Sequence, residues 1–293
     1  MTILRIATRS SEQARAQSEH VGTLLQHAHA GLRVEYVYVD TQGDVNATTP
    51  LHQMGGQGIF VKEVQRAVLD GRADIAVHSA KDLPSQPADG LVIGAFGERR
   101  NPHDALVGAC LDDLPNGATI ATGSVRRRAQ LLQVRPDLNF VDLRGNIQTR
   151  LSKIPSGGAI VMAVAAMEIL GITHQIAEQL SLDVAVPMVG QGSVAVECRE
   201  SDNTTGELLA HIDHASSRRA VEAERSFLFV LGAGCSRPVG AHLSVDGTFR
   251  AFMATDDCSS CVQLETYIGD TDDHLSIAAA IAHKCEQQLA GNS

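Results

Sequence analysis

Lys81 and Asp82 form the first pair of residues whose types and position suggest chemistry. They follow residues 74–77, a short and mainly apolar run that is typical of a buried strand. A carboxylate placed where a strand ends can stabilise a developing positive charge or transfer a proton. Aspartate is also a common turn and cap residue, so an ordinary turn is the alternative interpretation of Asp82.

Serine and arginine residues stand at the ends of two other predicted strands, where a helix begins. They are Arg9 and Ser11 in the first part of the chain, and Ser124, Arg126 and Arg127 in the second. Free backbone N–H groups and the helix dipole favour an anion at such positions. Arginine in the first turn opposes that dipole, so helix stability alone does not explain Arg126 and Arg127. Because a planar guanidinium binds both oxygens of a carboxylate, these residues predict a site for an organic anion.

The distribution of charge agrees with an anionic ligand. The chain has 293 residues and a formal net charge of −10, from 24 basic and 34 acidic residues. Residues 121–155 reverse this sign, because they include seven basic and only two acidic residues. A basic stretch within an acidic protein favours binding of an anion, and a solvated, salt-bridged surface is the alternative.

Composition disfavours several classes of protein. The aromatic content of 3% and the lack of tryptophan argue against a nucleic-acid binder that stacks bases. Arg5 and Arg9 interrupt the N-terminal apolar run, so it does not resemble a signal peptide, and the longest apolar run, 157–167, is too short to cross a bilayer. We therefore expect a cytoplasmic globular protein of two domains, or three small ones, with neither a membrane nor a nucleic-acid partner.

The cysteines do not predict a disulfide framework, because all six are scattered along a long chain. Cys235 stands in a glycine-rich loop, where the nearby Arg237 favours the reactive thiolate, and a small buried thiol is the alternative. Cys258 and Cys261 form a CxxC pair, which by itself is a weak signal because a metal site needs two more ligands. We expect no metal site.

Short apolar runs alternate with helical patterns through the first two thirds of the chain. The predicted strands are 3–7, 34–39, 74–77, 119–122, 140–143, 159–164 and 194–197, with helices that include 62–69. This alternation predicts α/β layers with largely parallel sheets.

Beyond residue 216 the pattern changes. The expected elements there are a helix at 217–231, strands at 241–245, 249–254 and 261–268, and a helix at 277–289. They predict a small α+β domain. Turn-rich breaks at 98–102 and 187–192 indicate connections between domains.

Together these motifs resemble the porphobilinogen deaminase family, also called hydroxymethylbilane synthase. The matching segments are ATRSS (7–11) with Gln17, TQGD (41–44), GGQGIFVKE (55–63), ADIAVHSAKDLP (73–84), GSVRRRAQL (123–131), DLRGNIQTRLSK (142–153), VGQGSVAVECR (189–199) and AERSFLFVLGAGCSRPVG (223–240). They follow the family's order and span most of the chain.

The resemblance implies three domains, namely two α/β lobes like those of type II periplasmic binding proteins and a small C-terminal α+β domain. On this chain the expected limits are 1–98 with 190–213, then 99–189, then 214–293. The implied activity is that of a transferase in porphyrin and heme biosynthesis. It condenses four porphobilinogen molecules head to tail into hydroxymethylbilane and releases ammonia. The family is usually monomeric and needs no metal.

The resemblance also implies residue roles. The family carries a covalent dipyrromethane cofactor, joined by a thioether to a loop cysteine that corresponds to Cys235 here. Asp82 matches the catalytic aspartate. The implied cofactor-binding residues are Lys81, Ser124, Arg126, Arg127 and Arg144, and the implied substrate-binding residues are Arg9, Ser11, Arg150 and Arg199. The acetate and propionate groups of the pyrroles are the organic anions that the arginines predict.

Two departures from the family pattern leave an alternative open. Gln53 and Gln57 stand where the family usually carries lysines near its GGxG segment. Fewer cations near the cleft would weaken the hold on an anionic chain. The alternative is therefore a diverged paralogue that binds the dipyrromethane or a tetrapyrrole anion with weak or no turnover.

Overall fold

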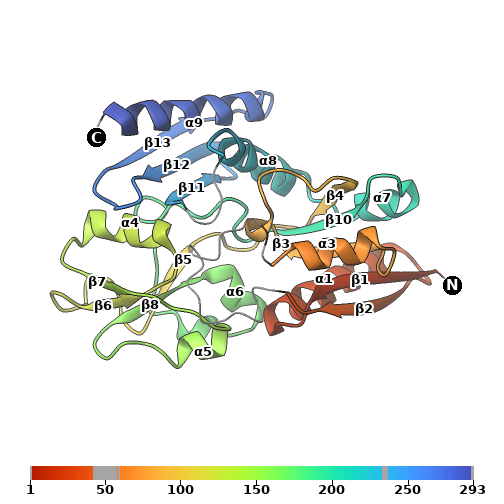
Figure 1. The fold of residues 1–293 in the computed structure, drawn as a ribbon, viewed down its shortest axis with the longest axis horizontal. Helices are drawn as coiled ribbons and strands as arrows, with labels where there is room; N and C mark the ends of the chain where they lie inside the picture. The colour runs from red at the N-terminus through yellow and green to blue at the C-terminus, as the bar shows by residue number, and fades with distance from the viewer. Residues whose placement is uncertain (1, 42–57, 59, 233–236, 292–293) are drawn as a thin grey trace.

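The computed structural model describes residues 2–41, 58, 60–232 and 237–291. These residues form two five-stranded sheets and one three-stranded sheet. Figure 1 shows the sheets as three bodies, with the C-terminal body (blue) above the other two. The two larger bodies are called lobe 1 and lobe 2, and the blue one the third domain.

Lobe 1 is built on a mixed sheet with the strand order β2-β1-β3-β10-β4. Its strands are β1 (Ile3–Arg9), β2 (Arg33–Val39), β3 (Ile75–Ser79), β4 (Leu91–Phe96) and β10 (Val194–Arg199). Strands β1, β2 and β3 are parallel, whereas β10 is antiparallel to its neighbours β3 and β4. Its helices are α1 (Glu12–Ala28), α3 (Lys62–Leu69) and α7 (Asn203–Ala210). Helices α1 and α7 pack on one face and α3 on the other.

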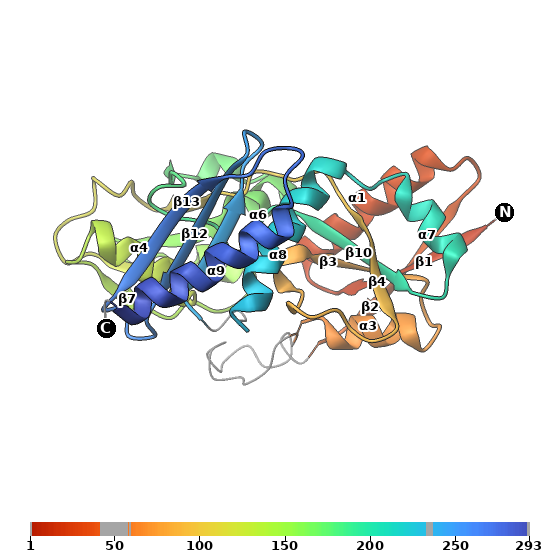
Figure 2. The same ribbon diagram turned by 90° about the horizontal axis from the view of Figure 1, so that it is seen from above.

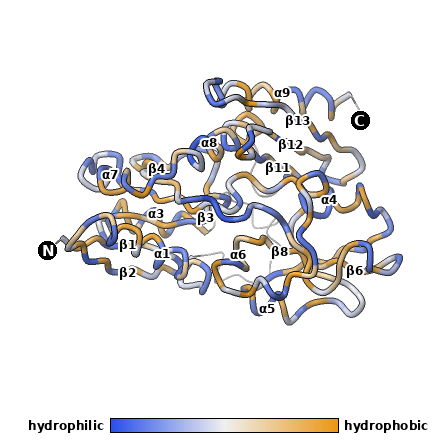
Figure 3. The backbone as a smooth tube through the Cα atoms, turned by 180° about the vertical axis from the view of Figure 1, so that it is seen from behind, coloured by the Kyte–Doolittle hydropathy of each residue, from blue (hydrophilic) through white to orange (hydrophobic). Residues whose placement is uncertain are grey.

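Lobe 2 repeats this arrangement with the strand order β7-β6-β8-β5-β9. Its strands are β5 (Asp104–Val107), β6 (Thr119–Ala121), β7 (Asn139–Val141), β8 (Ala159–Ala163) and β9 (Glu178–Gln179). Its helices are α4 (Val125–Val134), α5 (Ile147–Leu151) and α6 (Val164–Ile169). Strands β6, β7 and β8 are parallel, and β5 is antiparallel to β8 and β9. Figure 3 shows β8 and α6 as a largely hydrophobic stretch, and every residue of β8 is buried.

The antiparallel strands correct the expectation of largely parallel sheets. In each lobe the antiparallel strand is the one by which the chain enters from the other lobe. The segment 98–102 leads into β5, and the segment 187–192 leads towards β10. These two crossing segments coincide with the predicted breaks at 98–102 and 187–192. Each brings the chain into the next lobe just before the strand that lies antiparallel to its neighbours.

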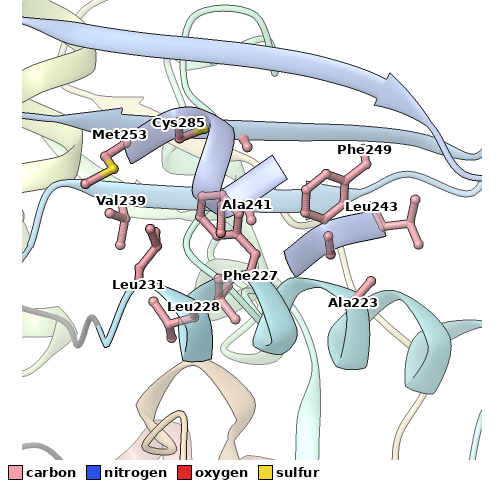
Figure 4. Packing of buried hydrophobic residues seen from close by; sticks show 14 of the residues in the cluster. Ala223, Phe227, Leu228, Leu231, Val239, Ala241, Leu243, Phe249, Met253 and Cys285 are labelled. Carbon is pink, nitrogen blue, oxygen red and sulfur yellow. The ribbon is translucent and has the colours of Figure 1, made fainter. Parts of the chain in front are cut away.

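The third domain is a three-stranded antiparallel sheet covered by two helices. Its elements are α8 (Ala215–Val230), β11 (Val239–Leu243), β12 (Thr248–Ala254), β13 (Cys261–Tyr267) and α9 (His274–Gly291). Figure 2 shows α9 crossing the sheet from above. Figure 4 shows Phe227 of α8 packed near Ala241 of β11 and Phe249 of β12. The small α+β architecture predicted for this region is confirmed.

Among the described residues, no helix is long and apolar enough to span a membrane.

Candidate active site

Lobe 1 places an ion pair at the carboxyl ends of β1 and β3. Strand β1 ends at Arg9, and Ser11 caps α1 by accepting a hydrogen bond from the N–H of Ala14 at 3.4 Å. Strand β3 leads into a single 3₁₀ turn, Ala80–Asp82. Because β1 and β3 are adjacent and parallel, their ends meet at one edge of the sheet. There, Nη1 of Arg9 lies 3.9 Å from Oδ2 of Asp82.

Lobe 2 places two arginines in the first turn of α4, as predicted. The hydroxyl of Ser124 caps this helix by accepting a hydrogen bond from the N–H of Arg127 at 3.4 Å. Arg126 and Arg127 are both buried. A solvated surface is therefore the wrong interpretation for this arginine pair.

A single carboxylate binds both guanidinium groups. Asp104, the first residue of β5, accepts hydrogen bonds from Nη2 of Arg126 at 2.7 Å and from Nη2 of Arg127 at 2.6 Å. The two Nη1 groups donate to the carbonyls of Val186 and Val161 at 2.6 and 2.9 Å. Burial alone would raise the pKa of Asp104, but the two arginines outweigh it and hold that pKa well below its usual range. The pair is thus held rigidly, with one negative charge shared between two positive ones.

The charges of the two lobes are coupled across the space between them. Burial lowers the pKa of Lys81 to about 8, with Asp82 opposing the shift and Arg127 and Arg150 adding to it. Burial and the charges of Arg127 and Arg144 lower the pKa of Arg150 to about 10, against the attraction of Asp82. Lys81 and Asp82 belong to lobe 1 and the arginines to lobe 2, so the fold brings both predicted groups into one site.

The segment around α5 holds the remaining predicted arginines. Nε of Arg150 donates to the carbonyl of Gly145 at 2.8 Å, and Nζ of Lys153 donates to the carbonyl of Arg144 at 3.3 Å. Burial lowers the pKa of Arg144, and Asp142 opposes this shift. Burial costs Arg150 more than Arg144, so a bound anion would favour the charged form of Arg150 in particular.

Two cavities border the site. One, of about 190 Å³, lies at the ends of β6 and β7 and is lined in part by Ser124, Arg128 and Phe140. The other, of about 20 Å³, lies between Lys81 and residues 190–193. The smaller cavity has room for about one water molecule.

Arg199 lies away from the other predicted residues, which corrects its assignment to the substrate site. Strand β10 is antiparallel to β3, with Val194 opposite Ser79 and Cys198 opposite Ile75. Arg199 therefore lies at the end of the sheet opposite to the Asp82 turn. Its guanidinium donates to the carbonyls of residues 68 and 73 at 2.9 Å and to an Asp202 oxygen at 2.7 Å, which is a structural role.

The predicted attachment residue, Cys235, lies outside the described residues, as do Gln53 and Gln57. The described chain on either side of Cys235 shows where its loop is anchored. Nη1 of Arg237 donates to the carbonyl of Leu231 at 3.0 Å, which links the start of β11 to the end of α8.

Of the CxxC pair, Cys258 lies in the turn between β12 and β13, and Cys261 is the first residue of β13. Cys258 and Cys261 pack against a small cluster formed by Ala129, Val186 and residues of β12. Burial raises the pKa of both thiols, which disfavours the thiolates that redox or metal chemistry requires. No group of three or more potential metal ligands occurs among the residues that the structure describes.

Sequence reasoning missed the buried polar residues that support the site. Asp104 is fully buried, and Gln191 joins it by donating from Nε2 to Oδ1 at 2.9 Å and to the carbonyl of Pro102 at 2.6 Å. Glu224 is fully buried in α8. The sequence offered one signal for both acidic residues, because each is a charged residue within an apolar stretch. Asp104 precedes Ala105 in β5, and Glu224 stands next to core residues in α8.

Two lobes that meet at charged residues from both, with Asp82 and Asp104 among several cations, define a two-lobed protein suited to binding an organic polyanion. A family model described as porphobilinogen deaminase, dipyromethane cofactor binding domain, matches residues 4–207. A second, described as porphobilinogen deaminase, C-terminal domain, matches residues 218–290. The chain belongs to the porphobilinogen deaminase family, which confirms the resemblance found in its motifs.

A curated relative agrees with this assignment. The protein named porphobilinogen deaminase of Nitratidesulfovibrio vulgaris (strain DSM 19637 / Miyazaki F) is 46% identical over 256 residues, which are 85% of this chain and 81% of the relative.

The chain also matches solved structures at lower identity. The methionine-binding protein MetQ has a TM-score of 0.45 at 15% identity, covering 80% of this chain and 97% of that one. The substrate-binding domain of a putative molybdenum ABC transporter from Clostridium difficile has a TM-score of 0.44 at 9% identity, covering 75% and 95%.

Proposed function

We propose that this protein condenses four porphobilinogen molecules head to tail into hydroxymethylbilane with release of ammonia, on a dipyrromethane carried by Cys235. The observation that carries the proposal is the meeting of Lys81 and Asp82 with Arg127 and Arg150 in one site. Family membership indicates the class of reaction, and this group of charged residues is the site where we propose that it occurs.

The residues present fit a dipyrromethane. The group bears acetate and propionate side chains, and guanidinium and ammonium groups are the donors that bind carboxylates most strongly. Arg127, Arg144, Arg150 and Lys81 are the residues that would hold it, with Ser124 as a hydroxyl donor. Nε of Arg127 is buried and has no hydrogen-bond partner among the described residues. Arg126 is only 3% exposed. We therefore propose that it binds Asp104 and adds positive charge to the site, and that it does not contact the dipyrromethane directly.

Lys81 and Arg150 explain why an anion belongs here. Their pKa values are lowered to about 8 and about 10 because they are poorly solvated and lie near other cations. A carboxylate at this place compensates that repulsion and favours the protonated forms. Binding of the anion therefore reduces the repulsion between Lys81, Arg150 and the other cations of the site.

Asp82 is the residue we assign to the chemical step. Loss of ammonia from a substrate leaves an electron-poor cation, and a carboxylate nearby stabilises it. The same carboxylate can accept a proton from the pyrrole and return it. Nη1 of Arg9 lies 3.9 Å from Oδ2 of Asp82, so the two opposite charges attract each other across the site. When bound, the dipyrromethane supplies the pyrrole end to which substrate units are joined.

The first experiment measures the intact mass and the turnover of the purified protein. We expect a mass above the sequence value by one dipyrromethane, absent from Cys235→Ser, and release of ammonia on incubation with porphobilinogen. An active protein of unmodified mass would refute the attachment. A modified protein that releases no ammonia would instead identify the diverged paralogue, to which the changes at Gln53 and Gln57 point.

The second experiment tests Asp82 with Asp82→Ala. The variant should keep its cofactor and its unfolding temperature but lose turnover by about a hundredfold or more. Hydroxymethylbilane production at the wild-type rate would contradict the role of Asp82.

We also keep the domain limits 1–98 with 190–213, 99–189 and 214–293 as a proposal, since the strands of each sheet fall inside them. A cytoplasmic location and a monomeric state belong to the same proposal. Size-exclusion chromatography with light scattering tests the latter.

A further inference from the structure

We propose that Arg225 is a positioning residue for Asp82, which it controls from the third domain by holding the turn that carries the aspartate. The inference rests on the proposed function, because that function gives Asp82 its role. It adds a link between the domain that contains the Cys235 loop and the residue assigned to the chemistry.

The position of Asp82 depends on the backbone of its turn. The turn Ala80–Asp82 is only three residues long. The distance of 3.9 Å between Arg9 and Asp82 is too long for a hydrogen bond. The N–H of Ala80 donates to the carbonyl of Ser193 at 2.9 Å, and the N–H of Leu83 donates to that of Ala80 at 3.3 Å. Contacts that hold this turn therefore determine where the carboxylate points.

Helix α8 covers the turn with two residues one helical turn apart. Val221 is fully buried and packs in one cluster with Ala80 and Leu83, which flank Lys81 and Asp82. Nη2 of Arg225 donates to the carbonyls of Pro84 at 2.9 Å and Ser85 at 3.3 Å, just beyond the turn. The packing of Val221 holds the turn against α8, and the two hydrogen bonds from Arg225 hold the backbone just after the turn.

A buried carboxylate attracts Arg225 electrostatically. Glu197 of β10 is 3% exposed and accepts hydrogen bonds from Nε2 of Gln65 at 2.9 and 3.1 Å. Nε2 of His78, four residues before Asp82, lies 3.1 Å from Oε2 of Glu197. Burial alone would raise the pKa of Glu197, but His78, Gln65 and Arg225 outweigh it and lower that pKa.

Charged groups therefore flank the turn on both sides. His78 precedes the turn and lies 3.1 Å from Glu197. Glu197 attracts Arg225 electrostatically, and Arg225 donates to the carbonyls that follow the turn. Replacing the guanidinium of Arg225 removes one cation from the surroundings of Glu197 and also removes both hydrogen bonds to the carbonyls of Pro84 and Ser85. A small displacement of a catalytic group is enough to lower a rate by one to two orders of magnitude.

Arg225→Gln tests the proposal, with Arg219→Gln as a matched control. Arg219 lies on the same helix, and its Nη2 donates to the carbonyls of Ile268 and Gly269 at 3.3 and 2.6 Å, within the third domain. The measurements are kcat and KM with porphobilinogen, the intact mass, and hydrogen exchange of the amides of residues 79–83. Arg225→Lys is the conservative variant.

We expect Arg225→Gln to keep its cofactor, to lower kcat by about tenfold or more with KM changed little, and to speed exchange at 79–83. Arg225→Lys should recover part of kcat, and Arg219→Gln should leave both readouts as in the wild type. If Arg225→Gln shows wild-type exchange at 79–83, or arrives without its cofactor, the positioning role is wrong. A wild-type protein with no turnover would refute the proposed function, and the exchange comparison would still decide this inference.

Discussion

Replacing Glu224 with glutamine tests whether the joint between the three domains depends on one buried charge. Oε1 of Glu224 accepts a hydrogen bond from Nη1 of Arg99 at 2.5 Å and from the N–H of Leu243 at 3.0 Å, and Oε2 accepts one from the N–H of Gly190 at 2.8 Å. These partners belong to the two crossing segments and to β11 of the third domain. The side chain is completely buried, so solvent cannot replace what a substitution removes.

The pKa of Glu224 gives the size of the effect. Burial alone would raise this pKa, but Arg99 and His242 outweigh it and lower it from 4.5 to about 2. At about 1.4 kcal/mol per pKa unit, the ionised carboxylate contributes about 3 kcal/mol to the free energy of unfolding. Because the folded pKa is depressed, this contribution is complete above the unfolded pKa of about 4.5 and is lost as the pH falls from there towards 2.

Urea unfolding at pH 7, 5, 4 and 3 measures this contribution. Glu224→Gln should lower the free energy of unfolding by about 3 kcal/mol at pH 7, and the difference from the wild type should shrink below pH 5. Glu222→Gln is the control, because Glu222 lies two residues away in a partly exposed pair with Arg218, for which we expect less than about 1 kcal/mol. A loss below about 1 kcal/mol for Glu224→Gln at pH 7, or a loss equal at pH 7 and pH 3, would refute the reasoning.

Three further predictions follow from single positions. Gly240→Ala should lower the free energy of unfolding by about 1–3 kcal/mol in urea, because a Cβ there would lie 2.8 Å from the carbonyl oxygens of both Val186 and Pro187; a neutral result would show that the third domain can shift on lobe 2. In the Cys235→Ser protein, the lowered pKa of Lys81, about 8, means that the unfolded chain binds more protons above that pH. Stability relative to Lys81→Met should therefore rise from about pH 8 to about pH 10 and stay flat below pH 8, and a falling difference would contradict the burial of Lys81. Arg199→Gln should keep kcat within about twofold of the wild type, because Arg199 lies at the far end of the sheet; a large loss in the same turnover assay would return it to the site.

Local elements were predicted well where one periodic pattern fills the element. The helix expected at 62–69 is α3, Lys62–Leu69, and the helix expected at 217–231 is α8, Ala215–Val230. The short strand β5, with the charged Asp104 at its start, was missed, since four residues carry too little pattern to separate a strand from a loop. The antiparallel direction of β10 was also missed, because it depends on how the chain returns from lobe 2.

For the site as well, the sequence predicted the types of residue but not their partners in the folded chain. Arg126 and Arg127 could be expected to meet an anion, but the motif does not reveal that Asp104 already binds them. Arg199 also stands in a segment that resembles the family, yet the antiparallel register of β10 places it at the opposite end of the sheet from Asp82.

The amino-acid sequence by itself determined the family, the kinds of chemical group in the site and most of the helices and strands, because these depend on residue types and on spacing within a few turns of chain. The tertiary structure alone decided which charges meet. Lys81 and Asp82 interact electrostatically with Arg127 and Arg150 only because two crossing segments bring the lobes together. Arg225 reaches the chain beyond Asp82 only because α8 packs on lobe 1. Electrostatic energies depend on distance and burial, and both are properties of the folded chain rather than of any segment of it.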